Sequence, residues 1–468
     1  MKDHIRQNQN FYQAELGEFP SDWPEATLNE LNSGQSPALK AGPFGSSLTK
    51  DIYVKSGFKV YGQEQVIRGD LTYGNYFIDE KKYRELKSCA VTEGDILLSL
   101  VGTAGKLLVV NSSAKAGVIN PRLIRFRFDS KKISSNFFKY MFESEIVQNH
   151  LETSAQGGTM AVLNAGMLKN LPIPLPVLPE QTAIANALSD VDALLTELEN
   201  LIAKKQAIKT ATMQQLLTGK TRLPQFATYT EGEKQGVPQG KCKGTKPSEL
   251  GEIPEDWDVS TIADISLVPM QNGLFYEPAR KGKGVPLINV SDMYTSAPIS
   301  VESLELFNAS KTELKAFKVN EGDLFFTRSS IVPNGIAFCN VLPKSDKEVV
   351  FDSHLIRVRV NPKIADYNYV YLNCLAKHSR LHLIANSKTA TMTTIDQKAI
   401  NCCPVLLPCK EEQTAIATIL SDMDSEIQTL EQRLAKTRQI KQGMMQELLT
   451  GRTRLPFKRL ETEQDGGS

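Results

Sequence analysis

The amino-acid sequence predicts a mixed α/β protein in which two strand-rich globular domains are joined by two long antiparallel coiled-coil helices. Three observations lead to this fold class. A stretch of 45 residues occurs twice, each copy carries the apolar spacing of a coiled coil, and each follows a region of short apolar runs separated by turn residues. The chain therefore has an internal pseudo-two-fold repeat.

The repeat is long enough to define one structural unit in each half of the chain. Residues 180–224 (EQTAIANALSDVDALL…QQLLTGKTRLP) return 232 positions later as residues 412–456 (EQTAIATILSDMDSEI…QELLTGRTRLP), with 26 of the 45 positions identical. Weaker matches continue upstream, where LGEFPSDW at residues 16–23 resembles LGEIPEDW at residues 250–257. Each half is expected to be a globular domain followed by a long helix.

Length and composition limit the class of protein. A chain of 468 residues is too long for one hydrophobic core and suits two domains with connecting elements. Its 54 basic and 53 acidic residues give a net charge of only +1, so any surface for an anion must be local. Seven cysteines without a C-x-x-C pair indicate reduced thiols, and neither a signal peptide nor a long apolar run occurs. We therefore expect a cytoplasmic protein that does not contact a membrane.

Each repeated stretch predicts a coiled-coil helix of about 37 residues, or about 55 Å in length. Its apolar residues alternate steps of four and three, the spacing of a coiled-coil seam. Pro179 stands at the start of the first copy, and Gly219 and Gly451 follow the last apolar residues as stop signals. Two amphipathic helices packed on their own domains are the alternative. The predicted seam residues are Ile184, Leu188, Val191, Leu195, Leu198 and Ile202 in the first helix, and Ile416, Leu420, Met423, Ile427, Leu430 and Leu434 in the second.

The charges of the two helices favour antiparallel pairing. The first helix is acidic early, as at Asp190, and basic late, as at Lys204; the second repeats this gradient from Asp422 to Lys441. Parallel helices would place like charges together, whereas antiparallel helices set acid against base. Each globular domain precedes its helix, so antiparallel helices would hold the two domains at opposite ends. Two similar surfaces at a fixed separation suit the reading of two half-sites on duplex DNA.

The globular regions are roughly residues 17–176 and 251–408. Both contain short apolar runs bounded by turn residues, such as ILLS after Asp95 and DLFFT from Asp323. LIRFRF at residues 123–128 and LIRVRV at residues 355–360 alternate apolar residues with Arg, which predicts half-buried strands. Helical segments are expected at residues 136–151 and 367–385. Each half is therefore expected to be a mixed α/β domain with a strand-rich core.

Candidate DNA contacts lie in and around the loops between these strands. Arg and Lys can bind phosphates and guanine edges, and Gln and Asn can bind adenine edges. The loop sequences differ between the two halves, whereas the helix sequences are similar. This is expected of a repeated scaffold whose two copies bind different DNA sequences. For any one residue, the alternative is an ordinary solvated loop. The candidates are Lys40, Ser46, Ser47, Gln63, Gln65, Arg68, Lys82 and Arg84 in the first half, and Gln271, Asn272, Arg280, Lys281, Lys283, Asn289, Arg328 and Ser329 in the second.

The patterns that could indicate an active site or a metal centre are incomplete. The tripeptide GKT at residues 219–221 resembles the end of a Walker A motif, but Gln214 stands where the earlier glycine belongs, and the tripeptide follows a helix. Cys374, His378 and His382 could lie on one face of a helix, yet they supply only three metal ligands. The sequence contains no nucleophile-elbow or amino-methyltransferase motif. We therefore expect no catalytic and no metal-binding residues in this chain.

An ordered set of motifs runs through both halves. It comprises GPFGSS at residues 42–47, EGDILLS at residues 93–99, LPIPLP at residues 171–176 followed by Glu180 and Gln181, LLTG at residues 216–219, and LGEIPEDW before the second domain. This set resembles the DNA-specificity (S) subunit of type I restriction–modification systems over residues 16–456. One departure is that the second domain has QNGLFY at residues 271–276 in the region of the GPFGS loop. Its readout residues therefore cannot be assigned by analogy with the first domain.

The resemblance implies a subunit that supplies sequence choice alone. Each globular half would be a target-recognition domain that reads one part of an asymmetric, bipartite site on double-stranded DNA. The helices would set the spacing of the half-sites. The same helices, including their seam residues, would form the docking surface for two modification (methyltransferase) subunits. The chain would hold no cofactor, because S-adenosylmethionine, ATP and Mg²⁺ would be bound by the modification subunits and by restriction (translocase/endonuclease) subunits.

Two other classes of protein stay open at this point. One is the recognition part of a fused restriction or methylation enzyme, and the other is a coiled-coil assembly adaptor with no role on DNA. The expected segments are an N-terminal tail (1–15), target-recognition domain 1 (16–176), a central spacer helix (177–224), a linker (225–249), target-recognition domain 2 (250–409), a distal spacer helix (410–456) and a C-terminal tail (457–468).

Overall fold

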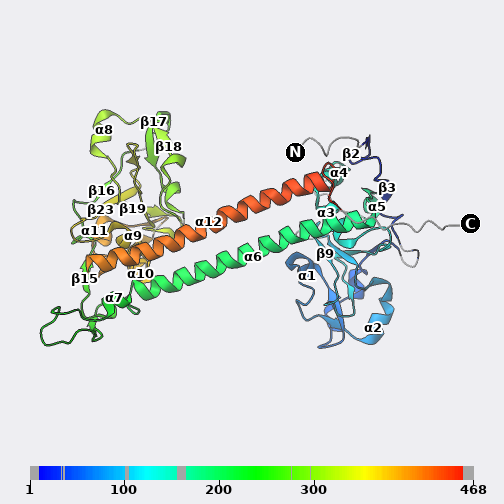
Figure 1. Cartoon of the computed structure of the whole chain (residues 1–468), viewed down its shortest axis with the longest axis horizontal. Helices are drawn as coiled ribbons and strands as arrows, with labels where there is room; N and C mark the ends of the chain where they lie inside the picture. Colours follow the sequence, from blue (N-terminus) through cyan, green and yellow to red (C-terminus); the bar gives the residue numbers. More distant parts are fainter. Residues whose placement is uncertain are drawn as a thin grey trace, which may run out of the picture. The chain divides into compact units, whose positions relative to one another are not determined.

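The computed structural model describes residues 10–32, 34, 37–100, 105–154, 165–275, 277–295, 297–389 and 391–456. Residues 1–9 of the expected N-terminal tail and all of the expected C-terminal tail lie outside this set. The chain divides into two compact units, one formed by Met1–Glu199 with Arg433–Ser468 and the other by Asn200–Gln432. Helices α6 (Leu178–Leu216) and α12 (Lys410–Leu448), of 39 residues each, contribute to both units (Figure 1). Within the described residues, no helix combines the length and the apolar character needed to cross a membrane.

The first unit is built around two four-stranded sheets. Its strands are β1 (Phe11–Gln13), β2 (Glu18–Pro20), β3 (Glu25–Thr27), β4 (Leu39–Ala41), β5 (Phe58–Tyr61), β6 (Phe77–Ile78), β7 (Ala90–Val91), β8 (Ile96–Ser99), β9 (Leu107–Val109), β10 (Gly117–Ile119), β11 (Leu123–Phe126) and β12 (Pro172–Pro174). Its shorter helices are η1 (Gly45–Ser47), η2 (Lys50–Ile52), α1 (Gln63–Arg68), α2 (Glu80–Glu85), η3 (Lys87–Cys89), α3 (Ser135–Glu143), α4 (Glu145–Ser154) and α5 (Ala165–Lys169). The sheets have the orders β6-β5-β10-β7 and β4-β11-β8-β9, and β5 pairs with β10 in parallel. Strands β1 and β2 form a hairpin, and β3 pairs with β12.

The second unit has the same central sheet and a different periphery. Its strands are β13 (Thr245–Ser248), β14 (Gly251–Pro254), β15 (Asp258–Thr261), β16 (Gln271–Asn272), β17 (Lys281–Ile288), β18 (Glu305–Phe307), β19 (Asp323–Thr327), β20 (Ser329–Ser330), β21 (Cys339–Val341), β22 (Val350–Phe351), β23 (Leu355–Arg359), β24 (Lys388–Thr389), β25 (Thr393–Thr394) and β26 (Pro404–Leu407). Its shorter helices are α7 (Pro224–Ala227), η4 (Pro278–Arg280), η5 (Val290–Met293), η6 (Val301–Ser303), α8 (Lys311–Ala316), η7 (Pro333–Gly335), α9 (Tyr367–Leu375), α10 (Lys377–Ala385) and α11 (Gln397–Asn401). The sheets have the orders β16-β23-β19-β21, β18-β17-β22 and β20-β25-β24.

The strands with alternating Arg residues lie at the centre of each unit, where β11 pairs with β8 and β23 pairs with β19. The prediction that these strands are half-buried is wrong, because Arg125 and Arg357 are only 2% and 7% exposed. Both faces of β11 are covered: Ile124 packs into one hydrophobic cluster and Leu123 into another. Burial lowers the pKa of both guanidinium groups, and Arg125 Nη1 donates to the carbonyl oxygen of Ala90 (2.5 Å).

The two helical segments expected inside the domains are each interrupted by one residue. Ser144 separates α3 from α4 and Ala376 separates α9 from α10, with extended backbone at both (ψ 149° and 154°). The prediction of continuous helices is therefore wrong, and Cys374 does not share a helix with His378 and His382. An apolar pattern that continues through the break gives no sign of it. The described residues include no group of three or more side chains placed to hold a metal ion.

In each unit, the end of one long helix lies beside the start of the other (Figure 1). Along these contacts, residue numbers rise on one helix as they fall on the other, so the helices run antiparallel within each unit. The pairs set acid against base in the way that the charge gradients predict. The ion pairs are Asp192–Lys441 and Glu199–Arg438 in the first unit, and Lys205–Glu426 and Lys209–Asp424 in the second.

The seam residues divide into two groups. Ile184 and Leu188 belong to the core of the first unit, and Ile416 and Leu420 belong to the core of the second, so the start of each helix packs on a globular domain. The later seam residues are all buried or half-buried; they are Val191, Leu195, Leu198, Ile202, Met423, Ile427, Leu430 and Leu434. A continuous coiled-coil seam stays a prediction.

Candidate nucleic-acid interface

A polar hollow of about 640 Å³ opens on the second unit and collects three of the sequence candidates. Its lining includes Asn272 at the end of β16, Arg328 between β19 and β20, and Ser329 at the start of β20. The lining residues that were not among the candidates include three that can contact a nucleic acid: His354, Lys388 and Gln397. These come from the turn before β23, from β24 and from α11, so only the fold brings them together.

Two of the side chains in the hollow form an amide pair. Gln397 Nε2 donates to Asn272 Oδ1 (2.9 Å), which leaves the Asn272 amide NH₂ and the Gln397 carbonyl oxygen as a neighbouring donor and acceptor. A donor beside an acceptor matches the major-groove edge of adenine, which presents N7 and the N6 amino group. The arrangement can therefore make two hydrogen bonds to one base edge.

The backbone of Arg328 is held on both sides while its side chain projects from the surface. Arg328 N donates to the carbonyl oxygen of His354 (2.8 Å), and Ile395 N donates to that of Arg328 (3.0 Å). No hydrogen bond or ion pair joins the Arg328 guanidinium to another described residue. His354 is 63% exposed and is oriented by Asp352, whose Oδ1 lies 2.8 Å from His354 Nδ1. The hollow therefore offers an unpaired cation and an oriented imidazole to a ligand.

The other candidates of the second unit are partly occupied within the protein. Arg280 Nη1 donates to Glu313 Oε1 (3.0 Å), and this pairing raises the pKa of Arg280 and lowers that of Glu313 to about 2. Lys281 pairs with Glu305 (3.0 Å). Gln271 Nε2 donates to the carbonyl oxygen of Ala316 (3.0 Å), Asn289 precedes η5, and Lys283 is exposed in β17.

The candidates of the first unit lie on four separate elements: Lys40 on β4, Ser46 and Ser47 on η1, Gln63, Gln65 and Arg68 on α1, and Lys82 and Arg84 on α2. Gln65 is 2% exposed and has a structural role, because Oε1 accepts from Gly62 N (2.8 Å) and Nε2 donates to the carbonyl oxygen of Tyr73 (2.8 Å). Arg68 covers the Tyr73 ring at 4.1 Å. Lys82 and Arg84 form exposed ion pairs with acids of α2.

A second polar site, which the sequence analysis did not identify, occurs where a long helix ends. In the second unit Arg222 follows α6, and its Nε and Nη2 each donate to the carboxylate of Glu412 in the first turn of α12 (2.7 Å each). Arg222 also donates to both oxygens of Asp256 (2.8 and 3.1 Å), and Trp257 Nε1 donates to Glu412 (3.1 Å). We call these four residues the junction clasp of the second unit. Burial alone would lower the pKa of Arg222, but its bonds to the two acids outweigh burial and raise it.

The first unit contains the same clasp. It consists of Arg454 after α12, Glu180 in the first turn of α6, Asp22 and Trp23. Arg454 donates to both acids, and Trp23 Nε1 donates to Glu180 (3.2 Å). The two repeated motifs ending in DW and in TRLP supply these residues, so each clasp joins a helix end, a helix start and a globular domain.

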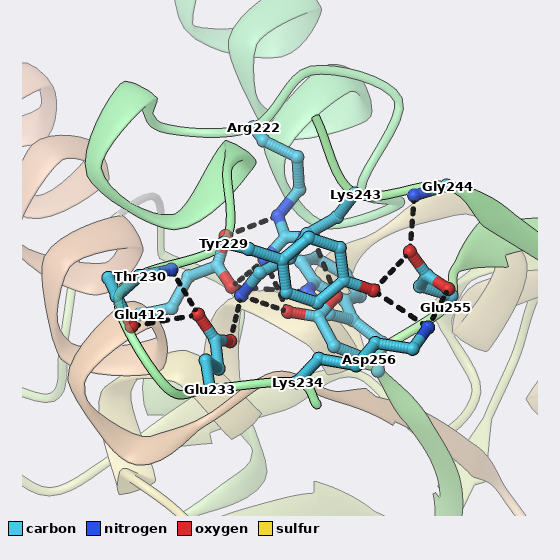
Figure 2. Close-up of polar contacts among 11 residues, drawn as sticks. Arg222, Tyr229, Thr230, Glu233, Lys234, Lys243, Gly244, Glu255, Asp256 and Glu412 are labelled. Carbon is cyan, nitrogen blue, oxygen red and sulfur yellow. Dashed lines mark hydrogen bonds and ion pairs between the residues drawn. The ribbon is translucent and has the colours of Figure 1, made fainter. Parts of the chain in front are cut away.

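Figure 2 shows that the clasp of the second unit is extended by residues of the connection after α7. Lys243 pairs with both Asp256 (3.0 Å) and Glu233 (2.5 Å). The bond from Lys243 to Glu233 is the largest of the causes that lower the pKa of Glu233 to about 2. The Tyr229 hydroxyl donates to Glu255 (2.6 Å), and this bond, with those from Gly244 N and Lys234, lowers the pKa of Glu255 to about 2. The connection is therefore tied to the helix junction by charge.

A family model and individual relatives with known names all point to the same protein family. The family model described as type I restriction modification DNA specificity domain matches residues 42–210 and 254–439, well over half of the chain. A Methanocaldococcus jannaschii protein, provisionally assigned as the specificity subunit of the type I restriction enzyme MjaX, is 24% identical, with 96% of this chain and 97% of that protein covered. The type I restriction enzyme EcoKI specificity subunit of Escherichia coli strain K12 is 22% identical, with 78% and 76% covered.

Solved structures share the fold. The crystal structure of a type I restriction–modification S subunit from M. genitalium has a TM-score of 0.54 at 14% identity, and covers 97% of this chain and 98% of its own. A chain from a structural study of the assembly of a type I R-M system has a TM-score of 0.51 at 15% identity, with 93% and 99% covered.

Proposed function

The chain belongs to the type I restriction–modification DNA specificity family, and from that membership we propose that each of its globular domains reads one half of a bipartite DNA site. The observation that carries the proposal is that the family model matches the chain twice, once in each half. Each half therefore contains its own match to the specificity domain. Because the loops of the two domains differ, the two half-sites differ in sequence.

We propose that the hollow of the second domain is its base-reading surface. Arg328 supplies an unpaired guanidinium, which can bind a phosphate or the O6 and N7 atoms of guanine. The amide pair of Asn272 and Gln397 supplies a donor and an acceptor for adenine. Lys388 is a further exposed cation and lies 3.9 Å from Asp396 of the same lining, so Arg328 leaves the hollow with local positive charge although the whole chain has a net charge of only +1.

The long helices are proposed to act as a spacer between the two domains and as the docking surface for two modification subunits. The repeat supports two partners, since two equivalent helices present two equivalent surfaces. Leu201, Ile208 and Ile440 support docking, because these helix residues are 39%, 41% and 48% exposed although apolar. In this proposal α6 and α12 pair as a coiled coil, and their antiparallel contacts within each unit are consistent with it.

Chemistry is assigned to the partners. We propose that modification subunits bring S-adenosylmethionine and methylate the DNA, and that restriction subunits bring ATP and Mg²⁺ for translocation and cleavage. This chain supplies the choice of sequence. In its own polar clusters at the helix junctions the charges are paired with one another, so that loss of one partner would be destabilising.

The test is sequencing, with a method that detects modified bases, of DNA from cells that express this chain with the methyltransferase subunit of its system. Control cells lack one or the other. We expect a split motif that is methylated only when both proteins are present. If the two proteins assemble and no motif depends on this chain, the proposal is refuted and a coiled-coil adaptor is favoured.

The same assay tests the hollow. Arg328→Ala should relax or abolish recognition in one half of the motif and leave the other half unchanged, with a cost of about 1–3 kcal/mol if Arg328 contacts a base. Lys363→Ala is the matched control, because Lys363 is an exposed cation of the same unit that does not line the hollow. Equal effects of the two substitutions would show that the hollow does not read DNA.

A further inference from the structure

Two exposed phenylalanines occupy the same place in the two domains. Phe44 is 87% exposed and Phe275 is 83% exposed. Their equivalence follows from strand register: Ala41 pairs with Ile124 of the first domain, and Asn272 pairs with Ile356 of the second. Ile124 and Ile356 are repeat positions, 232 apart, so Phe44 and Phe275 each lie three residues beyond equivalent strand positions. The GPF of the first domain therefore corresponds to the GLF of the second.

The backbone fixes each loop so that the ring projects. A Cβ on Gly42 would lie 1.8 Å from the carbonyl oxygen of Asn120, and a Cβ on Gly273 would lie 2.1 Å from that of Phe351. Glycine is therefore required at both positions for the loop to approach this backbone. The two loops lie against equivalent backbone segments, and the phenylalanine follows two residues after the glycine.

A basic residue stands two positions after Asn120 in the first domain and after Asp352 in the second, and the carbonyl groups of Asn120 and Asp352 lie against the loop glycines. In the first domain, Asn120 Oδ1 accepts from Arg122 N (2.9 Å), and Arg122 is exposed with no hydrogen bond or ion pair from its guanidinium to a described residue. In the second domain, Asp352 Oδ1 accepts in the same manner from His354 N (2.7 Å), and His354 lines the hollow that contains Arg328. Each domain thus has an exposed aromatic ring on this loop and an unpaired guanidinium in the same region, Arg122 in the first domain and Arg328 in the second. Both groups suit a nucleic acid, which offers stacked bases next to phosphates.

The ring is identical in the two domains although the surrounding loops differ. A residue that reads a base should vary between domains with different half-sites. Stacking on a base is tolerant of sequence, because every base has a π face. A ring that both domains share, on loops that otherwise differ, therefore indicates a contact that both half-sites share.

We propose that Phe44 and Phe275 are aromatic wedges, each of which inserts at one base-pair step of the half-site bound by its own domain and partly unstacks it. Apolar side chains that act in this way are known to deform duplex DNA and to increase the contact surface. The unpaired guanidinium groups in the same regions hold the phosphates of the opened step. This inference rests on the proposed function, because it assumes that both domains bind DNA.

The test uses the complete complex of this chain with its methyltransferase subunits and a duplex that contains the methylated motif. The adenine analogue 2-aminopurine is placed in turn along each half-site, outside the methylated base, and its fluorescence rises where a step is unstacked. We expect one such step in each half-site. Phe275→Ala should abolish the rise in one half-site only, Phe44→Ala in the other, and each should weaken binding about 5- to 100-fold.

Two variants keep the result interpretable. Phe275→Trp retains an aromatic face and should retain the fluorescence rise. Leu381→Ala removes a side chain that is 57% exposed on α10 of the same unit, and should change neither signal nor affinity.

Each other outcome has a distinct meaning. If the unsubstituted complex binds the motif specifically but no step responds to Phe44→Ala or Phe275→Ala, the wedge is refuted and the proposed function stands. Loss of assembly with the methyltransferase in these variants would also refute the wedge, because the rings would then be protein contacts. If the unsubstituted complex shows no preference for the motif, the proposed function and the wedge both fail.

Discussion

Replacing Arg222 by alanine removes one partner of a buried ion pair and leaves the other partner, Glu412, in place. Its side chain is 10% exposed and makes four hydrogen bonds, two to Glu412 and two to Asp256. The side chain of Glu412 is only 1% exposed, so Arg222→Ala leaves a buried carboxylate with the Trp257 indole N–H as its remaining side-chain partner among the described residues. Such a change costs about 3–5 kcal/mol. We expect about 3 kcal/mol, because Asp256 is 30% exposed and water can reach the vacated space.

Tryptophan fluorescence can measure this cost in one unit. The chain has two tryptophans, Trp23 and Trp257, and each belongs to one junction clasp. In a Trp23→Phe background, Trp257 alone reports urea unfolding of the second unit. With a slope of about 3 kcal/mol/M, a loss of about 3 kcal/mol lowers the midpoint by about 1 M.

Lys234→Ala is the matched control for this measurement. It removes a cation from an exposed pair with Glu255, and should shift the urea midpoint much less than Arg222→Ala does. If the midpoint is the same with and without Arg222, or if the two substitutions shift it equally, the buried clasp does not stabilise the helix junction and the reasoning is refuted.

Three further changes test other parts of the account. The pKa of Glu255 is lowered from 4.5 to about 2, so its contribution to stability is complete above about pH 4.5 and is lost as the pH falls toward 2. Glu255→Gln should therefore reduce the pH dependence of the urea midpoint between pH 4.5 and 2, and an unchanged pH dependence would contradict this. Gly42→Ala places a Cβ 1.8 Å from a carbonyl oxygen and should lower Tm by about 5 °C for a cost of about 2 kcal/mol, whereas Gly45→Ala, with no atom within 4 Å, should leave Tm unchanged; equal Tm values would contradict the close approach. Lys283→Ala should weaken DNA binding for all sequences and reduce the salt slope by about 1, while Arg280→Ala should weaken it less because Glu313 holds that guanidinium; the reverse order in a salt titration would contradict the assignment.

The long helices were predictable because their signals are local. Apolar spacing and charge gradients predict two helices of about 37 residues, and the structure has two of 39. Ion pairs such as Lys205–Glu426 agree with the predicted charge pairing. The alternation around Arg125 was misleading, because a sequence pattern cannot distinguish water from a second hydrophobic cluster on the far face of a strand.

The junction clasps could not be recognised from sequence although both of their motifs were visible. Arg222 and Glu412 are 190 residues apart, and only antiparallel helices bring them together. The hollow has the same origin: Asn272 and Gln397 are 125 residues apart and belong to different elements. A shift of one residue in spacing concealed the equivalence of the two Gly-x-Phe loops, which strand register shows directly.

The most direct test of two reading domains at a set separation is to lengthen the helices. Four residues are inserted after Ala203, with a matched insertion after Ala435 so that both helices lengthen by about 6 Å. The methylated motif is then determined by sequencing modified DNA from cells that also express the methyltransferase subunit. We expect the same two half-sites with a spacer longer by one to two base pairs, at about 3.4 Å per base pair. Altered half-sites with an unchanged spacer would contradict the account.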